Sequence, residues 1–302
     1  MDRSPQRRWR LSRAELLAGC AVFVATAGIV QPLMAQQASR MALTAAVAEE
    51  GTVRIDRSKD ALGIDYAVKD GHLYSDKAPA QPVLAAVPYL AYKAVGGESA
   101  VHLRVRGNLG LWWISVWSAA LPLAALVVVM ARLARPVSDR WSLPAALAFG
   151  FGSLLFPFGS VLFSHTASAA LVAGAILVWR RGRAQPRDLV LTGALLGGAV
   201  AVEYTAVAAL GVVALASVAR DRWRAGWLAV GAAGPLAAVM AYQWLAFGSP
   251  LRVPYRYHVQ GLHNSAVAGL TAPSLERLWR MTIGANGLFV LTPVVLLALV
   301  GG

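Results

Sequence analysis

The sequence predicts an all-α, polytopic membrane protein whose helices cross a bilayer about eight times. Of its 302 residues, 57% are hydrophobic and only 14% are charged, against about 25% charged in an ordinary soluble domain. Several charge-free runs are longer than the ~18 residues expected of a membrane-spanning helix. These two observations argue against a soluble enzyme. Arginines cluster beside the apolar runs, and their positions predict how the chain is oriented.

Run lengths predict individual spans and two hairpins. The run from Trp141 to Trp179 has 39 residues, too long for one helix that rises about 1.5 Å per residue across a core of about 30 Å. We therefore expect it to turn near Ser164 and His165. The run 189–219 is interrupted only by Glu203 and predicts a second hairpin. The predicted spans are 16–35, 109–131, 142–163, 166–179, 189–202, 204–219, 225–247 and 288–302.

The basic residues predict a cytoplasmic amino terminus. With that orientation, 15 of the 28 Lys and Arg residues fall in four short inner segments, as expected when basic residues favour the cytoplasmic side. The net charge of +13 is then mostly a topology signal, and we expect no nucleic-acid partner. A cleaved signal peptide is the alternative for the first run, which is longer than the usual apolar stretch of about 7 to 15 residues.

Two long segments are predicted outside the membrane, 36–108 and 248–287. Within the first, Pro79 to Val95 is apolar, and we interpret it as an interfacial or re-entrant helix because a further span would place Arg132, Arg135 and Arg140 outside. We treat 1–302 as a single transmembrane module. Its last apolar run has no basic flank, so we expect the protein to continue beyond it.

Residues 51–77 form the densest polar segment of the chain and carry five aspartates. The segment ends in Tyr74-Ser75-Asp76-Lys77-Ala78-Pro79, where a carboxylate and an amine stand at the mouth of an apolar stretch. Charges in such a place act on a bound anion more strongly than they would in bulk water. A solvated loop is the alternative interpretation.

This run, together with Gln81-Pro82 and the apolar stretch to Tyr92, resembles the first outer loop of multispanning glycosyltransferases of the GT-C superfamily. That superfamily includes the lipid A aminoarabinose transferases and the protein O-mannosyltransferases. Weaker matches are Gln37-Ala38-Ser39-Arg40, Arg54-Ile55-Asp56, Phe163-Ser164-His165, Glu203-Tyr204, Phe247-Gly248-Ser249-Pro250 and Gly287-Leu288-Phe289.

The resemblance implies transfer of a sugar from a polyprenyl-phosphate donor to an acceptor at the outer face of a bacterial cytoplasmic membrane, without a cofactor. It implies a first-loop carboxylate as general base, for which Asp56 and Asp65 are the candidates. It also implies cations that hold the departing phosphate, namely Lys77 with Arg104 or Arg106. The expected partners are the lipid-linked donor, membrane lipid, and a cell-envelope glycan, lipid or protein as acceptor.

The chain departs from this family pattern at Gln36 and Gln37, where relatives carry an acid, and at Ala80 and Asn286. A catalytically divergent member is therefore one alternative to the transferase interpretation. A transporter or flippase for a lipid-linked or small anionic substrate is another.

Further side chains are predicted to bind substrate. Glu203 stands between two short apolar runs and should lie below the membrane surface, where an ionisable group normally faces a cavity or a partner. His165 stands at the other hairpin turn, and a structural role is the alternative for both. In the second outer segment, Tyr255 and Arg256 have side chains that pack on sugar rings or pair with phosphate. An interfacial aromatic belt with solvated charges is the alternative for this segment. The full predicted substrate-binding set is Tyr74, Asp76, Lys77, Arg104, Arg106, His165, Glu203, Tyr255 and Arg256.

A metal site is not expected. His258 and His263 are five residues apart with no acid at ligand spacing, and Cys20 is the only cysteine.

Overall fold

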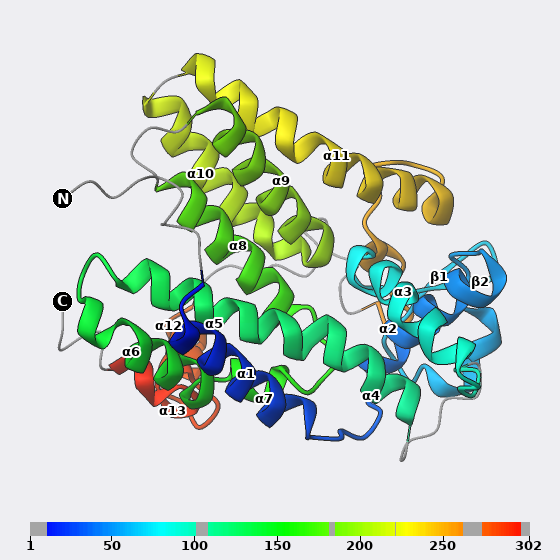
Figure 1. Ribbon diagram of the computed structural model, residues 1–302. Helices are drawn as coiled ribbons and strands as arrows, with labels where there is room; N and C mark the ends of the chain where they lie inside the picture. The colour runs from blue at the N-terminus through cyan, green and yellow to red at the C-terminus, as the bar shows by residue number, and fades with distance from the viewer. Residues whose placement is uncertain (1–10, 101–107, 181–184, 221, 262–273, 297–302) are drawn as a thin grey trace.

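The computed structural model describes residues 11–100, 108–180, 185–220, 222–261 and 274–296, and these are mostly helical, as expected (Figure 1). The helices are α1 (Arg13–Ala27), α2 (Ala35–Ala45), α3 (Ala80–Ala94), α4 (Leu109–Ser115), α5 (Leu121–Ala134), α6 (Asp139–Gly152), α7 (Leu155–Phe158), α8 (His165–Trp179), α9 (Pro186–Val202), α10 (Val207–Arg220), α11 (Arg222–Phe247), α12 (Leu275–Thr282) and α13 (Leu288–Leu291). Shorter helical turns occupy Ala46–Glu50, Asp56–Ala61, Val116–Ala120, Tyr204–Ala206, Pro254–Tyr257 and Pro293–Val295. One antiparallel hairpin, β1 (Ala67–Lys69) with β2 (His72–Tyr74), departs from the all-helical expectation.

Two predicted spans are wrong in length. The run 16–35 is helical only to Ala27, where Gly28 caps α1, and α2 begins anew at Ala35. Pro32 lacks an N–H and disfavours helical geometry for the residue before it, which explains the break. The run 142–163 is divided because α6 ends at Gly152 and Ser153 is extended. Of the predicted last span, 288–302, the structure describes only the part up to residue 296.

Two helices of the described residues could cross a membrane by length and composition. They are Leu109–Ala134, which joins α4 and α5, and Ala225–Phe247 within α11. The helices His165–Trp179 and Tyr204–Arg220 are apolar but shorter. The other predicted spans stay predictions.

The helix ends form two opposite sides of the molecule. In Figure 1 the ends of α5, α8 and α10 and the starts of α6, α9 and α11 lie toward the left of the view, whereas α2, α3 and the hairpin lie toward the right. The first side carries Arg132, Arg135, Arg140, Arg180, Arg187, Arg220 and Arg222. The turn Pro293–Val295, which follows α13, contacts α6. Figure 1 shows α12 and α13 at this end of the molecule, far from the hairpin, so 248–261 and 274–287 do not share one side. The backbone N–H of Leu154 donates to Thr292 Oγ1 at 3.3 Å in this region.

Glycines bring α9 and α11 into backbone contact. A methyl group added at Gly231 would lie 1.9 Å from the carbonyl oxygen of Val190, and one added at Gly193 would lie 2.0 Å from that of Leu228. No side chain can rotate away to relieve such contacts, because the neighbouring atoms belong to the main chain. We call Gly193, Gly197 and Gly231 the glycine seam.

We predict that Gly231→Ala destabilises the protein although alanine favours helix formation by about 1 kcal/mol over glycine. Overpacking costs about 1–3 kcal/mol, and here the clash is with backbone. Gly234→Ala is the matched control, since a methyl group there meets nothing within 4 Å. Thermal unfolding of the detergent-solubilised protein should show a lower midpoint for Gly231→Ala and an equal or higher one for Gly234→Ala. Equal midpoints for the two variants would contradict the packing argument.

Candidate active site

The β1–β2 hairpin fixes the segment that carries the predicted ion pair. Its turn consists of Asp70 and Gly71 with φ of 51° and 81°, the left-handed geometry that an Asp-Gly hairpin turn uses. Asp56 holds the second strand, because its Oδ1 accepts from the Leu73 N–H at 2.6 Å and its Oδ2 lies 2.9 Å from His72 Nδ1. The chain then leaves β2 directly into Ser75, Asp76 and Lys77 and on into α3.

Lys77 lies between two carboxylates. Its Nζ is 3.1 Å from Asp65 Oδ1 and 2.8 Å from Asp76 Oδ2. The Asp76 side chain is 1% exposed and that of Lys77 is 11% exposed. Three of the predicted site residues are thus brought together, and their charges are shielded from bulk water.

Serine and histidine side chains surround Asp76. Ser39 Oγ of α2 is 3.3 Å from Asp76 Oδ1 and 3.0 Å from Ser75 Oγ. His258 Nε2 faces Asp76 Oδ2 at 3.7 Å, and its Nδ1 accepts from the backbone N–H of Gln260. This hydrogen bond assigns the proton of the neutral ring to Nε2, the nitrogen that faces the carboxylate.

Arg40, the residue after Ser39, leads to a second polar group. The Arg40 guanidinium donates to Ser164 Oγ at 3.1 Å, and Ser164 Oγ is hydrogen-bonded to Glu203 Oε2. His165 Nδ1 lies 3.8 Å from the same Glu203 oxygen. Arg40 is 4% exposed, and its Nε is buried without a hydrogen-bond partner in the described part of the chain. The two predicted residues His165 and Glu203 are therefore neighbours.

Because Ser39 and Arg40 are consecutive, α2 joins the two groups into one site. We call Ser39, Arg40, Asp65, Asp76, Lys77, Ser164, His165, Glu203 and His258 the polar cluster. Burial lowers the pKa of Arg40, whereas Glu203 and then Asp76 raise it. The same carboxylates act on Tyr255. Burial, followed by the charges of Glu203 and Asp76, raises the pKa of Tyr255 to about 12. Its hydroxyl consequently stays protonated near neutral pH.

Other predicted site residues lie elsewhere. Asp56 contacts the hairpin through both of its carboxylate oxygens. Tyr74 packs in the hydrophobic core against Phe247, with ring centroids 5.4 Å apart. Arg256 is exposed. Arg104 and Arg106 fall outside the described residues. The roles predicted for these residues stay predictions.

Sequence reasoning missed Ser39, Arg40 and Ser164 as site residues, and it considered His258 only as a metal ligand, a role that it did not expect. The available signal was a single arginine in a segment that is otherwise uncharged from residue 16 to residue 48, since an isolated charge that becomes buried needs partners. Ser164 was expected only at a hairpin turn and within a weak family match, and its contacts could not be predicted because its partners lie 124 and 39 residues away in the chain.

Asp65, Asp76 and His258 are the described residues that could hold a metal ion, with ligand atoms all within 4.8 Å of one another. The Lys77 ammonium already lies against both carboxylates. A metal ion bound there would have to displace the ammonium from the carboxylates and the proton from the histidine nitrogen that faces them. Lysine therefore supplies the positive charge in this arrangement.

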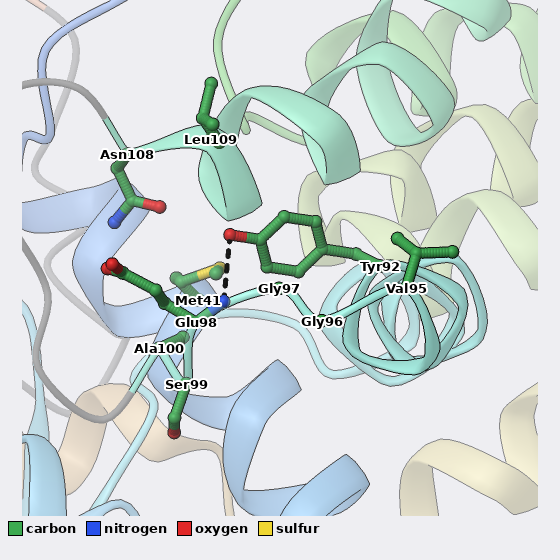
Figure 2. A pocket seen from close by; sticks show the side chains of 10 residues that line it. All are labelled: Met41, Tyr92, Val95, Gly96, Gly97, Glu98, Ser99, Ala100, Asn108 and Leu109. Carbon is green, nitrogen blue, oxygen red and sulfur yellow. Dashed lines mark hydrogen bonds between the residues drawn. The ribbon is translucent and has the colours of Figure 1, made fainter.

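A cavity of about 420 Å³ lies on another side of α2, between the end of α3 and the start of α4 (Figure 2). Met41 lines it, directly after the two α2 residues of the polar cluster. Glu98 donates its backbone N–H to the Tyr92 hydroxyl at 3.2 Å across the cavity wall. The cavity is separate from the polar cluster, which contributes none of the lining residues shown in Figure 2.

Comparisons with protein-family models, with curated proteins and with solved structures found no match for this chain. The chemical groups of the polar cluster itself are therefore the evidence for its chemistry. Two cations, Arg40 and Lys77, lie close to three carboxylates. Such a set can hold an anionic group and accept a proton from a neighbouring hydroxyl.

We predict that Lys77→Met destabilises the protein strongly, because it leaves buried Asp76 without its cation. Breaking a buried ion pair costs about 3–5 kcal/mol, and adding Asp76→Asn should restore part of the loss. Lys69→Met is the control, since the Lys69–Asp70 pair at 2.7 Å has a 78% exposed carboxylate and contributes little. The unfolding temperatures of Lys77→Met, of its combination with Asp76→Asn, and of Lys69→Met are compared with that of the wild type. A similar shift for Lys77→Met and Lys69→Met would show that the buried pair is not what stabilises this region.

Proposed function

We propose that this chain is a multi-pass membrane glycosyltransferase. It transfers a sugar from a polyprenyl-phosphate donor to an acceptor hydroxyl at the extracytoplasmic face of a bacterial cytoplasmic membrane. The observation that carries the proposal is the polar cluster, in which the largely buried Lys77 pairs with two carboxylates and the buried Arg40 is linked to a third through Ser164. The departing lipid phosphate needs cations and the attacking hydroxyl needs a proton acceptor, and the cluster supplies both.

Arg40 and Lys77 are suited to a phosphate group. The buried Arg40 Nε has a hydrogen to donate and no partner among the described residues, and a phosphate oxygen would satisfy it. Lys77 is linked to Arg40 through Asp76 and Ser39. Lys77 donates to Asp76, Ser39 donates to Asp76, and Ser39 directly precedes Arg40 in the chain. Arg104 and Arg106 remain proposed phosphate partners from the sequence.

The position of the cluster fits chemistry at an outer surface. The arginine-rich helix ends lie on the side opposite to α2, α3 and the hairpin (Figure 1). Basic residues favour the cytoplasmic side of a membrane, so this orientation turns the cluster outward. Helix α3 supports an interfacial placement: Val83, Leu84, Val87 and Leu90 are exposed, whereas Gln81, Ala85 and Tyr89 are buried.

The test is donor turnover by the full chain in lipid nanodiscs. A panel of radiolabelled polyprenyl-phosphate hexoses and pentoses is supplied with cell-envelope glycan and lipid fractions, and released polyprenyl phosphate and labelled product are measured. We expect one donor to be consumed, and we expect Lys77→Arg to retain more activity than Lys77→Ala, which should lose about 100-fold or more.

Lys69→Ala is the matched control, because Lys69 pairs with exposed Asp70 outside the cluster. Turnover of no donor in the panel would overturn the proposal, as would full activity of Lys77→Ala. Uptake of a labelled donor into sealed vesicles without any product would favour transport instead.

A further inference from the structure

We infer that Glu203 is the group that takes the proton from the acceptor hydroxyl, and that His165 passes this proton to solvent. The inference rests on the proposed transferase function and assigns its general base. It differs from the expectation that a first-loop aspartate, Asp56 or Asp65, has this role.

The hydrogen-bond chain from Arg40 orients Glu203 as a proton acceptor. A guanidinium can only donate, so Ser164 Oγ must accept from Arg40. The Ser164 proton is then free to point at Glu203 Oε2, which requires the carboxylate oxygen to accept. Glu203 Oε1 makes no hydrogen bond within the described ranges, and the side chain is 18% exposed. One oxygen is therefore held in place while the other remains open to a substrate.

The main chain leaves Glu203 between two helical segments. Helix α9 ends at Val202 and a new helical turn begins at Tyr204, which leaves Glu203 in an extended conformation with φ −151° and ψ 112°. A continuous helix at this point would point the side chain along one face of the bundle. The break aims it toward Ser164 at the start of α8.

His165 connects Glu203 with solvent. Its Nδ1 is 3.8 Å from Glu203 Oε2, and its side chain is 43% exposed. The ring is held edge-on against Phe158, with centroids 4.8 Å apart. An imidazole can accept a proton on one nitrogen and release another from the opposite nitrogen. Because 3.8 Å is beyond hydrogen-bond distance, the relay requires a bridging water or an approach of the ring to Glu203.

The other carboxylates of the region are each bound by the hairpin or by Lys77, the cation assigned to the departing phosphate. Both oxygens of Asp56 hold the hairpin. Asp76 Oδ1 accepts from Ser39 and Oδ2 from Lys77, and Asp65 pairs with Lys77. Glu203 has no lysine or arginine within ion-pair distance among the described residues, although the Arg40 charge acts on it through Ser164.

The step balances without a further reactant. The acceptor O–H bond breaks while the acceptor oxygen bonds to the anomeric carbon of the sugar. The bond from that carbon to the phosphate oxygen breaks, and its electron pair leaves on the phosphate beside Lys77 and Arg40. The proton goes to the Glu203 carboxylate, then to His165, and finally to water.

The decisive variant is Glu203→Gln, which keeps an oxygen that accepts from Ser164 but cannot take a proton. We expect kcat to fall about 100-fold or more, with the donor KM and the unfolding temperature little changed. Glu203→Asp should retain measurable turnover because it keeps a carboxylate. Glu276→Gln is the control, since Glu276 is an exposed glutamate that pairs with Arg280.

The relay is tested by His165→Ala in the presence and absence of imidazole. We expect a loss of turnover that added imidazole restores in part. If Glu203→Gln fails to fold, the inference is decided by whether a series of substituted imidazoles of similar size restores turnover of His165→Ala in proportion to their basicity, since refilling the space left by the ring would not follow basicity.

Different failures are distinguishable. Wild-type turnover together with an undiminished kcat in Glu203→Gln overturns the inference and leaves the transferase function standing. The same holds if Asp65→Asn abolishes turnover while Glu203→Gln does not, or if imidazole has no effect on His165→Ala. Absence of turnover by the wild type with every donor overturns both the function and the inference.

Discussion

The Lys77 ammonium, held between Asp65 and Asp76, is the interaction on which this end of the molecule depends. A buried cation is tolerated only when carboxylates and further hydrogen bonds compensate for its lost hydration. Here the compensating groups come from separate parts of the chain. Asp65 precedes β1, Asp76 follows β2, and His258 arrives after α11, where it forms a bridge with Ala67. The contacts of His258 with Asp76 and Ala67 therefore tie the first loop to the segment after α11.

Because Lys77 already has two partners, binding of an anion would be an exchange and not a simple capture. An incoming phosphate would have to replace a carboxylate at the ammonium group. Arg40 differs, since its Nε is buried without a partner in the described residues. The two cations would thus contribute differently: Arg40 offers an unused donor, whereas Lys77 offers a charge whose present partners can be displaced. This division favours ligands that present several oxygens at once.

Patterns that act over short distances in the chain predicted much of this structure. The expected apolar runs 166–179, 189–202, 204–219 and 225–247 correspond to helices α8, α9, α10 and α11. The single charge at Glu203 predicted the break between α9 and the following turn. Helix ends were predicted less well: the run 16–35 contains Gly28 and Pro32, whose effect on the helix outweighed the apolar composition. Asp65, Asp76 and Lys77 were predicted because they lie in one polar segment. Arg40 and Ser164 were missed because their contact joins residues 124 apart, and no periodicity encodes such a meeting.

The glycine seam has a consequence for the chemistry as well as for packing. Helix α9 leads directly into Glu203, and α11 leads into the segment that carries Tyr255 and His258. Where two helices touch through their main chains, no layer of rotatable side chains lies between them to absorb displacement. The carboxylate and the groups after α11 are therefore mounted on a common stiff support. A site on such a support has its dipoles already arranged before a reaction begins, so little free energy is lost to reorganising them as charge develops.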